Sequence, residues 1–107
     1  MRIALIFVCL LFGQAALADD SEQVCMAGGY YSGASDRFLS GVAMHILQKR
    51  SQLGTAKCSA LWQAAFTAGE HFSKTGQLAA ATDREFLDAA NAFSSRVYSS
   101  VSKSAGY

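Results

Sequence analysis

The sequence contains no proline and few charged residues, and neither sign of charge dominates. Charged residues make up 16% of the 107 residues, with nine Lys and Arg against eight Asp and Glu. This balance argues against the strongly basic surface with which proteins bind nucleic acids or acidic lipids. Nothing resembles a repeat, a linker or a block of like charge, so the length favours one compact domain.

Catalytic and metal-binding motifs are also missing from the chain. There is no G-x-S-x-G nucleophile motif, no phosphate-binding loop and no C-x-x-C-H haem-attachment sequence. His45 has no metal-ligating residue three or four positions away, and His71 has only the adjacent Glu70, which belongs to a different helix face. We therefore predict surface histidines, no metal, no cofactor and no enzymatic activity.

The N-terminus has the three parts of a secretory signal peptide. Arg2 precedes an apolar run from Ile3 to Phe12, and the sequence Ala16-Leu17-Ala18 follows. The run is shorter than the roughly 20 apolar residues that span a bilayer. We predict a cleaved signal peptide over residues 1–18, a single domain over residues 19–107 and a periplasmic or secreted location. No transmembrane segment is expected after cleavage; the alternative is an uncleaved anchor.

Two cysteines remain after removal of this leader, because Cys9 lies within it. An even number of cysteines in an exported chain indicates a disulfide, and Cys25 and Cys58 allow one connectivity. Their wide separation differs from the C-x-x-C spacing of redox and metal centres. We predict a structural disulfide between Cys25 and Cys58.

Three segments show apolar residues at helical spacing, and no segment alternates with the period of two that strands require. The predicted helices cover residues 37–50, 56–74 and 83–102. The third is the most regular, with one apolar row opposite a row of charged and amide residues. That apolar row consists of Phe86, Ala90, Phe93, Val97 and Val101.

Capping residues stand at the ends of these segments. Ser35 or Asp36 precedes the first helix, and Thr55 precedes the second. Thr82 and Glu85 fit a capping box at the start of the third. Gly54 and Gly76 are predicted to end the first two helices.

The segment before residue 37 is harder to interpret. Glycine lowers helix stability by about 1 kcal/mol per residue, and the segment from Gly28 to Gly33 contains three glycines. Two interpretations remain open. The segment forms a short helix from Ser21 that merges with the next helix, or Gly28–Gly33 is a loop. The predicted fold class is all-α, a small bundle of three to four helices with one disulfide.

Adjacent tyrosines within this glycine-rich segment are candidates for partner binding. Tyrosine offers a large contact area and a hydroxyl at low entropic cost, which suits recognition surfaces. We predict partner contacts by Tyr30, Tyr31 and Asp36. In the alternative interpretation, the glycines allow close helix packing and a tyrosine fills the core.

The same residues carry a local resemblance to a known family. Cys25, Gly29, Tyr30, Gly33 and Asp36 form the pattern C-x3-G-Y-x2-G-x2-D. This pattern resembles an element of the periplasmic helical immunity proteins that neutralise type VI secretion amidases. The resemblance covers the twelve residues from Cys25 to Asp36. It implies a small, exported, helical protein with a disulfide that binds another protein.

These features predict a non-enzymatic protein that acts by protein–protein contact, with the partner's identity and a homodimer left open. The first hypothesis is an accessory factor of an envelope machine, such as a secretion or conjugation apparatus. The second is a periplasmic immunity or inhibitor protein that blocks a toxin or hydrolase. The third is a periplasmic stress chaperone, since those proteins also have few helices and one disulfide.

Overall fold

Four α-helices and no strand make up residues 20–104, the part of the chain that the computed structural model describes, with side chains over residues 20–100. This confirms the all-α prediction; the predicted signal peptide over residues 1–18 lies outside the described residues. Residues 20–33 are helical throughout, and we call this helix the central helix. It is followed by α2 (Arg37–Lys49), α3 (Ala56–Thr75) and α4 (Arg84–Ser104).

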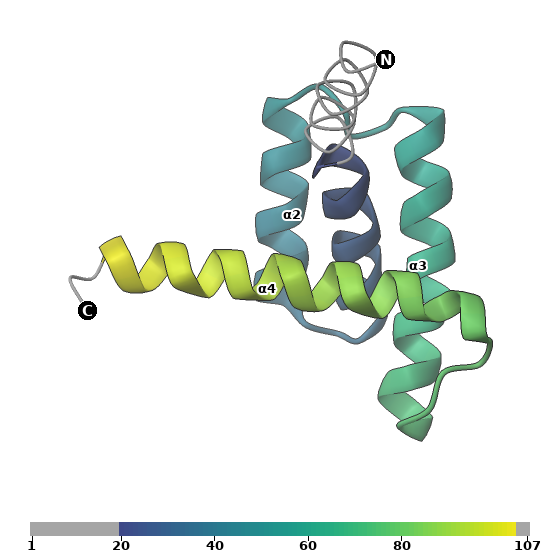
Figure 1. The fold of residues 1–107 in the computed structure, drawn as a ribbon. Coiled ribbons are helices and arrows are strands. Elements are labelled where there is room, and N and C mark those ends of the chain that lie inside the picture. The colour runs from purple at the N-terminus through teal and green to yellow at the C-terminus, as the bar shows by residue number, and fades with distance from the viewer. Residues whose placement is uncertain (1–19, 105–107) are drawn as a thin grey trace, which may run out of the picture.

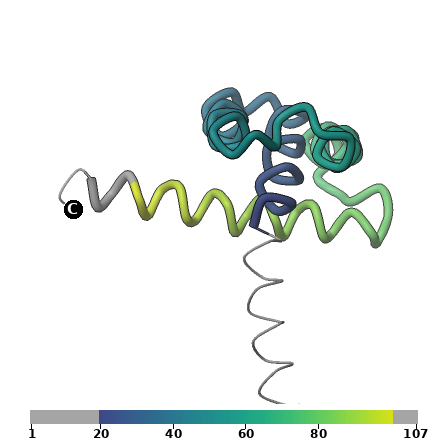
Figure 2. The backbone as a smooth tube through the Cα atoms, turned by 90° about the horizontal axis from the view of Figure 1, so that it is seen from above, coloured from purple at the N-terminus to yellow at the C-terminus, as the bar shows by residue number. Residues whose placement is uncertain are grey.

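The helices form two layers around the core. The central helix lies between α2 and α3, and α4 crosses over all three (Figure 1). The view turned by 90° places α4 in a layer of its own, with its second half extending beyond the other helices (Figure 2). No helix within the described residues combines the length and apolar character needed to cross a membrane.

The central helix is buried on every side. All seven residues from Val24 to Tyr30 are buried, which no amphipathic helix on a surface would allow. The glycine-rich segment is therefore helical. It does not merge with α2, because the chain turns at Ser35, whose φ is 65°, and Asp36 then caps α2 by accepting a hydrogen bond from the Leu39 amide.

Glycines bring the central helix and α3 into backbone contact. A Cβ atom at Gly29 or Gly33 would lie closer than 3.0 Å to the carbonyl oxygen of Trp62 or Phe66, respectively. A Cβ atom at Gly69 would meet the carbonyl oxygen of Tyr30 in the same way. The packing gained at this contact outweighs the low helix propensity of glycine.

The disulfide between Cys25 and Cys58 is confirmed. It joins the central helix to the first turn of α3, with 5.4 Å between the two Cα atoms. Both cysteines are buried in the core beside Val24, Leu47 and Phe93. The crosslink therefore reinforces the same helix pair that the glycines bring together.

Most of the predicted helix ends are confirmed. Thr55 caps α3 by accepting a hydrogen bond from the Cys58 amide, and Gly76 ends that helix with a φ of 74°. Two predictions were wrong. α2 ends at Lys49, within one residue of the predicted end, but Gly54 is not the residue that stops it, because the chain already turns left-handed at Ser51. Thr82 lies inside a 3-10 turn (η1, Ala81–Asp83) that leads into α4, rather than at a helix N-cap.

Candidate functional site

Tyr30 and Tyr31, predicted to contact a partner, lie largely inside the fold. Tyr30 is 7% exposed and packs near Phe72, with 6.5 Å between the ring centroids. Tyr31 is half-buried, and its hydroxyl donates a 2.7 Å hydrogen bond to the carbonyl oxygen of Ala90 in α4. Burial raises the pKa of both tyrosine hydroxyls. These placements agree with the alternative interpretation, in which the tyrosines pack the core.

The remaining residues of the C-x3-G-Y-x2-G-x2-D pattern have structural roles as well. Cys25 forms the disulfide, and Gly29 and Gly33 allow the contact with α3. The Asp36 side chain is occupied in capping α2. The pattern therefore describes one helix, its packing and the turn that follows it. The prediction that its residues contact a partner stays a prediction, and little of their surface is available for it.

The two histidines lie on the surface, as the sequence indicates. His45 is exposed on α2 and His71 is exposed on α3. Within the described residues, no group of three or more His, Cys, Asp and Glu side chains lies close enough together to hold a metal ion.

A groove where α2 and α4 cross is a candidate binding site. Its volume is about 550 Å³, and we call it the α2–α4 groove. Its lining consists of Phe38, Val42, Ile46, Phe93, Arg96, Val97 and Ser100. Phe93 belongs to the core, whereas Val42, Ile46 and Val97 pack against that core and remain half-buried. The floor of the groove is therefore continuous with the hydrophobic core.

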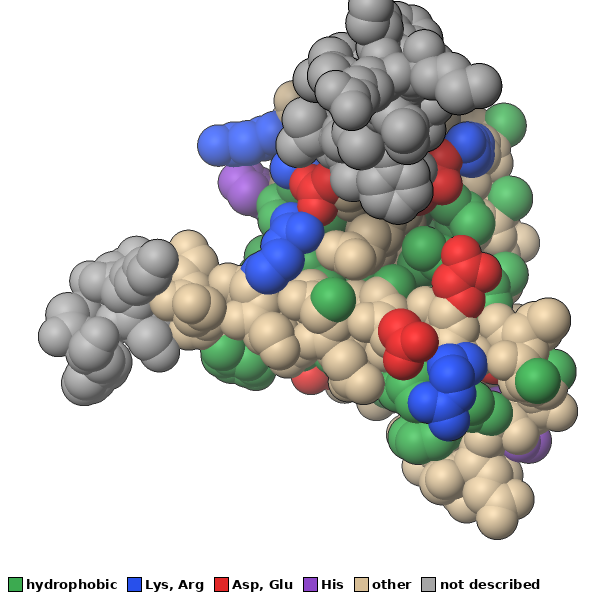
Figure 3. All heavy atoms as spheres, viewed as in Figure 1, with side chains coloured by type: hydrophobic (Ala, Val, Ile, Leu, Met, Phe, Trp, Pro, Cys, Tyr) green, Lys and Arg blue, Asp and Glu red, His purple; other side chains and the backbone are tan. Residues whose placement is uncertain are grey.

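Two exposed aromatic side chains stand at the edge of this groove. Phe38 is 53% exposed and Tyr98 is 51% exposed, although both are large apolar groups. Their rings contact each other across the helix crossing, with 6.2 Å between the centroids. Figure 3 shows apolar surface along the lower edge of the second half of α4, and acidic side chains over its first half. Large aromatic groups exposed beside an apolar groove are typical of protein-binding surfaces.

Regular helical spacing places these side chains together. Phe38, Val42 and Ile46 recur every four residues and form one row along α2. Phe93, Val97 and Ser100 form a matching row along α4 at spacings of four and three. Phe38 was not among the residues predicted to bind a partner. Its spacing at i, i+4 and i+8 with Val42 and Ile46 was the available signal, while Leu39, Ala43 and Leu47 of the same helix are buried.

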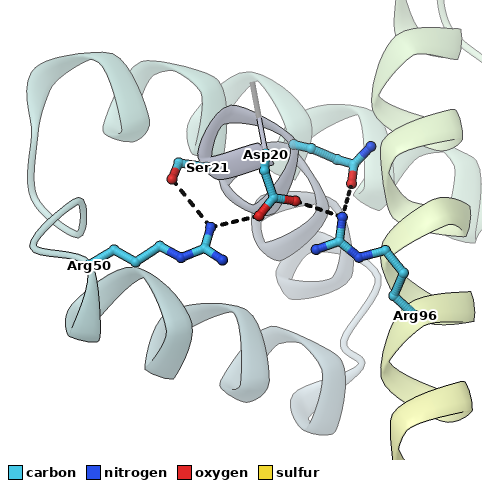
Figure 4. A network of polar contacts seen from close by, with 5 residues as sticks. Asp20, Ser21, Arg50 and Arg96 are labelled. Atoms are coloured by element: carbon cyan, nitrogen blue, oxygen red, sulfur yellow. Dashed lines mark hydrogen bonds and ion pairs between the residues drawn. The ribbon is translucent and has the colours of Figure 1, made fainter. Parts of the chain in front are cut away.

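An ion-pair network that includes Arg96 of the groove lining ties three helices together (Figure 4). The Asp20 carboxylate accepts hydrogen bonds from Arg50 at 2.8 Å and from Arg96 at 2.6 Å. Arg50 also donates to the Ser21 hydroxyl, and Arg96 donates to the Gln23 side-chain oxygen. Residues 20–23 of the central helix are thereby held to the end of α2 and to α4.

Replacing Asp20 with asparagine is expected to lower the free energy of unfolding at pH 7 more than at acidic pH. The hydrogen bond from Arg96 is the largest cause that holds the pKa of Asp20 below its ordinary value. Because the pKa is depressed in the folded state, the carboxylate stabilises the fold above about pH 4, and this stabilisation is lost as the pH falls through the folded pKa.

Urea unfolding of the wild type and Asp20→Asn at pH 7 and at pH 2.5 measures this effect. The difference between the two proteins should shrink on acidification. Asp88→Asn removes an exposed carboxylate from α4 and serves as the control. An equal penalty for Asp20→Asn at both pH values would contradict the prediction.

A second hollow lies on the opposite side of α2, beside Cys58. It is smaller, at about 380 Å³, and Met44, Leu53 and Trp62 supply its apolar lining. Three polar side chains share that lining: Ser32, Ser59 and Gln63. The α2–α4 groove is the stronger candidate because its lining is mostly apolar and two exposed aromatic groups border it.

Comparisons with known proteins identify no relative. No protein-family model matches the chain, and no curated protein and no solved structure is significantly similar to it.

Proposed function

We propose that this protein binds another protein through the α2–α4 groove. The exposure of Phe38 and Tyr98 beside an apolar groove carries the proposal. Aromatic anchors of this kind supply much of the binding energy at protein interfaces, because a partner that covers them removes a large apolar area from water. Every other large aromatic side chain of α4 and the central helix lies in or against the core.

The proposed setting is the periplasm or the extracellular space. A buried disulfide is typical of exported proteins, and the N-terminal sequence has the parts of a signal peptide. There the protein would serve as a non-enzymatic accessory factor of an envelope machine, such as a secretion or conjugation apparatus. The alternative is an immunity or inhibitor protein, in which the groove holds a segment of a toxin or hydrolase.

Affinity capture from an envelope extract tests the proposal when the wild-type protein and variants with substitutions at the groove are used as baits. The oxidised mature protein should retain a stoichiometric partner that Phe38→Ala/Tyr98→Ala loses. Phe66→Ala removes an exposed phenylalanine from α3, away from the groove, and should retain the partner. Circular dichroism and melting temperature should show that all three baits are folded, because Phe38 and Tyr98 are half-exposed.

The identity of the captured protein separates the roles. A component of a secretion or conjugation apparatus supports the accessory factor, and a toxin or hydrolase supports the inhibitor. Equal capture by the wild type and by Phe38→Ala/Tyr98→Ala would contradict binding through the groove. Capture of many unrelated proteins after acidification alone would instead favour a stress chaperone.

A further inference from the structure

Along the α2–α4 groove, neither α2 nor the second half of α4 carries an acidic residue. α2 carries Arg37, His45 and Lys49, and no Asp or Glu occurs between Arg37 and Lys49. From Ala89 to its end, α4 carries Arg96 and Lys103 and again no Asp or Glu. Since the whole chain is nearly neutral, its acidic residues must lie elsewhere. Four of them are Glu70 in α3, Asp83 in η1, and Glu85 and Asp88 in the first turns of α4.

The cations beside the groove exceed the anions available to them. Arg50 and Arg96 share the single carboxylate of Asp20. Arg37 and Lys49 are both exposed, and neither forms an ion pair within residues 20–100. Arg37 is adjacent to Phe38, and Lys49 continues the row of Val42 and Ile46 one turn further along α2. Asp36, the N-cap of α2, lies next to Arg37, so two carboxylates, Asp20 and Asp36, stand against four cations, and the border of the apolar floor keeps an excess of positive charge.

The dimensions of the groove match those of a short α-helix. Along α2 the apolar row runs from Phe38 to Ile46, eight residue steps or about 12 Å, and along α4 the lining runs from Phe93 to Ser100, seven steps or about 10 Å. An amphipathic helix that lays two or three turns into such a notch places its apolar side chains on the floor and its flanking side chains against the rim. Charge complementarity requires those flanking side chains to be acidic.

We infer that the α2–α4 groove binds an amphipathic helix of a partner protein whose apolar face is flanked by Asp and Glu. The inference rests on the proposed function and specifies the chemistry of the partner. A second copy of this chain fits less well, because a two-fold axis through the groove would bring Arg37, Lys49 and Arg96 against their own counterparts. A membrane surface fits less well because the apolar surface is concave, with its floor between two helices.

A display library of short amphipathic helices tests the inference directly. The apolar positions are held constant, and the flanking positions are drawn equally from Glu, Lys and Gln. The library is selected against the oxidised wild type and, in parallel, against Phe38→Ala/Tyr98→Ala. Clones enriched by the wild type alone depend on the groove, and we expect Glu to exceed Lys among their flanking residues.

One enriched peptide is then measured against charge variants of the protein. Arg37→Glu/Lys49→Gln should weaken its binding about fivefold or more at low ionic strength, and added salt should reduce the difference. Arg84→Glu, which changes an exposed arginine at the far end of α4, should change binding less than twofold. Glutamate at the first residue of a helix interacts favourably with the helix dipole, so Arg37→Glu and Arg84→Glu should both fold.

The outcomes separate this inference from the proposed function. Groove-dependent clones with neutral or basic flanks would overturn the inference and leave the proposed function standing. Enrichment that persists with Phe38→Ala/Tyr98→Ala, or no enrichment, would count against both. If the protein sediments with phosphatidylglycerol vesicles through the groove and enriches no peptide, the groove binds a membrane surface. If the protein forms a dimer that Phe38→Ala/Tyr98→Ala dissociates, the groove binds a second copy. Either result overturns the inference.

Discussion

Replacing both Cys25 and Cys58 with alanine is expected to lower the melting temperature by about 15 °C or more. The disulfide joins residues 33 positions apart, and the loss of chain entropy in the unfolded state then stabilises the fold by about 3.8 kcal/mol. In a domain of this size each kcal/mol corresponds to roughly 4–8 °C. Thermal unfolding followed by circular dichroism measures the shift.

The reduced wild type provides the matched control, because it retains both sulfur atoms but lacks the crosslink. Its melting temperature should lie close to that of Cys25→Ala/Cys58→Ala. Both cysteines are buried, so reduction should need prior unfolding or denaturant. If Cys25→Ala/Cys58→Ala melted within about 3 °C of the oxidised wild type, the result would contradict a structural role for the disulfide.

Gly29→Ala is expected to reduce the free energy of unfolding by about 3 kcal/mol. The new Cβ atom would overlap the carbonyl oxygen of Trp62, and a backbone atom cannot move aside as a flexible side chain can. The central helix and α3 would have to separate, which opens the packing around Tyr30 and Ala65. Overpacking of this kind typically costs about 1–3 kcal/mol, and the rigid contact places Gly29→Ala at the upper end. Urea unfolding gives the value.

Gly41→Ala is the control for Gly29→Ala. Gly41 lies within α2, and beyond the adjacent residues and the backbone of its own helix no atom lies within 4 Å of the position of its missing Cβ. The same substitution should therefore stabilise the protein by about 1 kcal/mol, because alanine favours helix more than glycine does. If both substitutions changed stability in the same direction, the helix contact at Gly29 would not be the cause.

Sequence periodicity identified α2, α3 and α4 because each buries one face and exposes the other. In α4, for example, Phe93 is buried while Asn91 and Arg96 are exposed. The same periodicity could not identify the central helix, because it is buried on all sides and its sequence does not alternate between apolar and polar faces. Its glycines also argue against a helix when only local propensity is considered. The contact of Gly29 with Trp62, 33 residues away, decides the structure, and no local pattern contains it.

The candidate site was harder to predict than the fold. Tyr30 and Tyr31 attracted attention because aromatic residues among glycines are typical of recognition loops, yet a buried helix uses the same residue types for close packing. Phe38 and Tyr98 lie 60 residues apart in the sequence and come together only where α4 crosses α2. A binding surface formed by two distant helices requires the tertiary structure.

The order of the helices along the chain also has a kinetic consequence. The helix at the centre comes first and the helix that covers it comes last, so the Tyr31–Ala90 hydrogen bond closes a loop of 59 residues. The disulfide shortens the path between these residues to about 38, by way of Cys25 and Cys58. Because the probability of closure scales with loop length to the power −3/2, oxidation should make the docking of α4 about twofold more frequent in the unfolded chain. The crosslink is thus expected to favour the docking of α4 kinetically in addition to stabilising the folded chain.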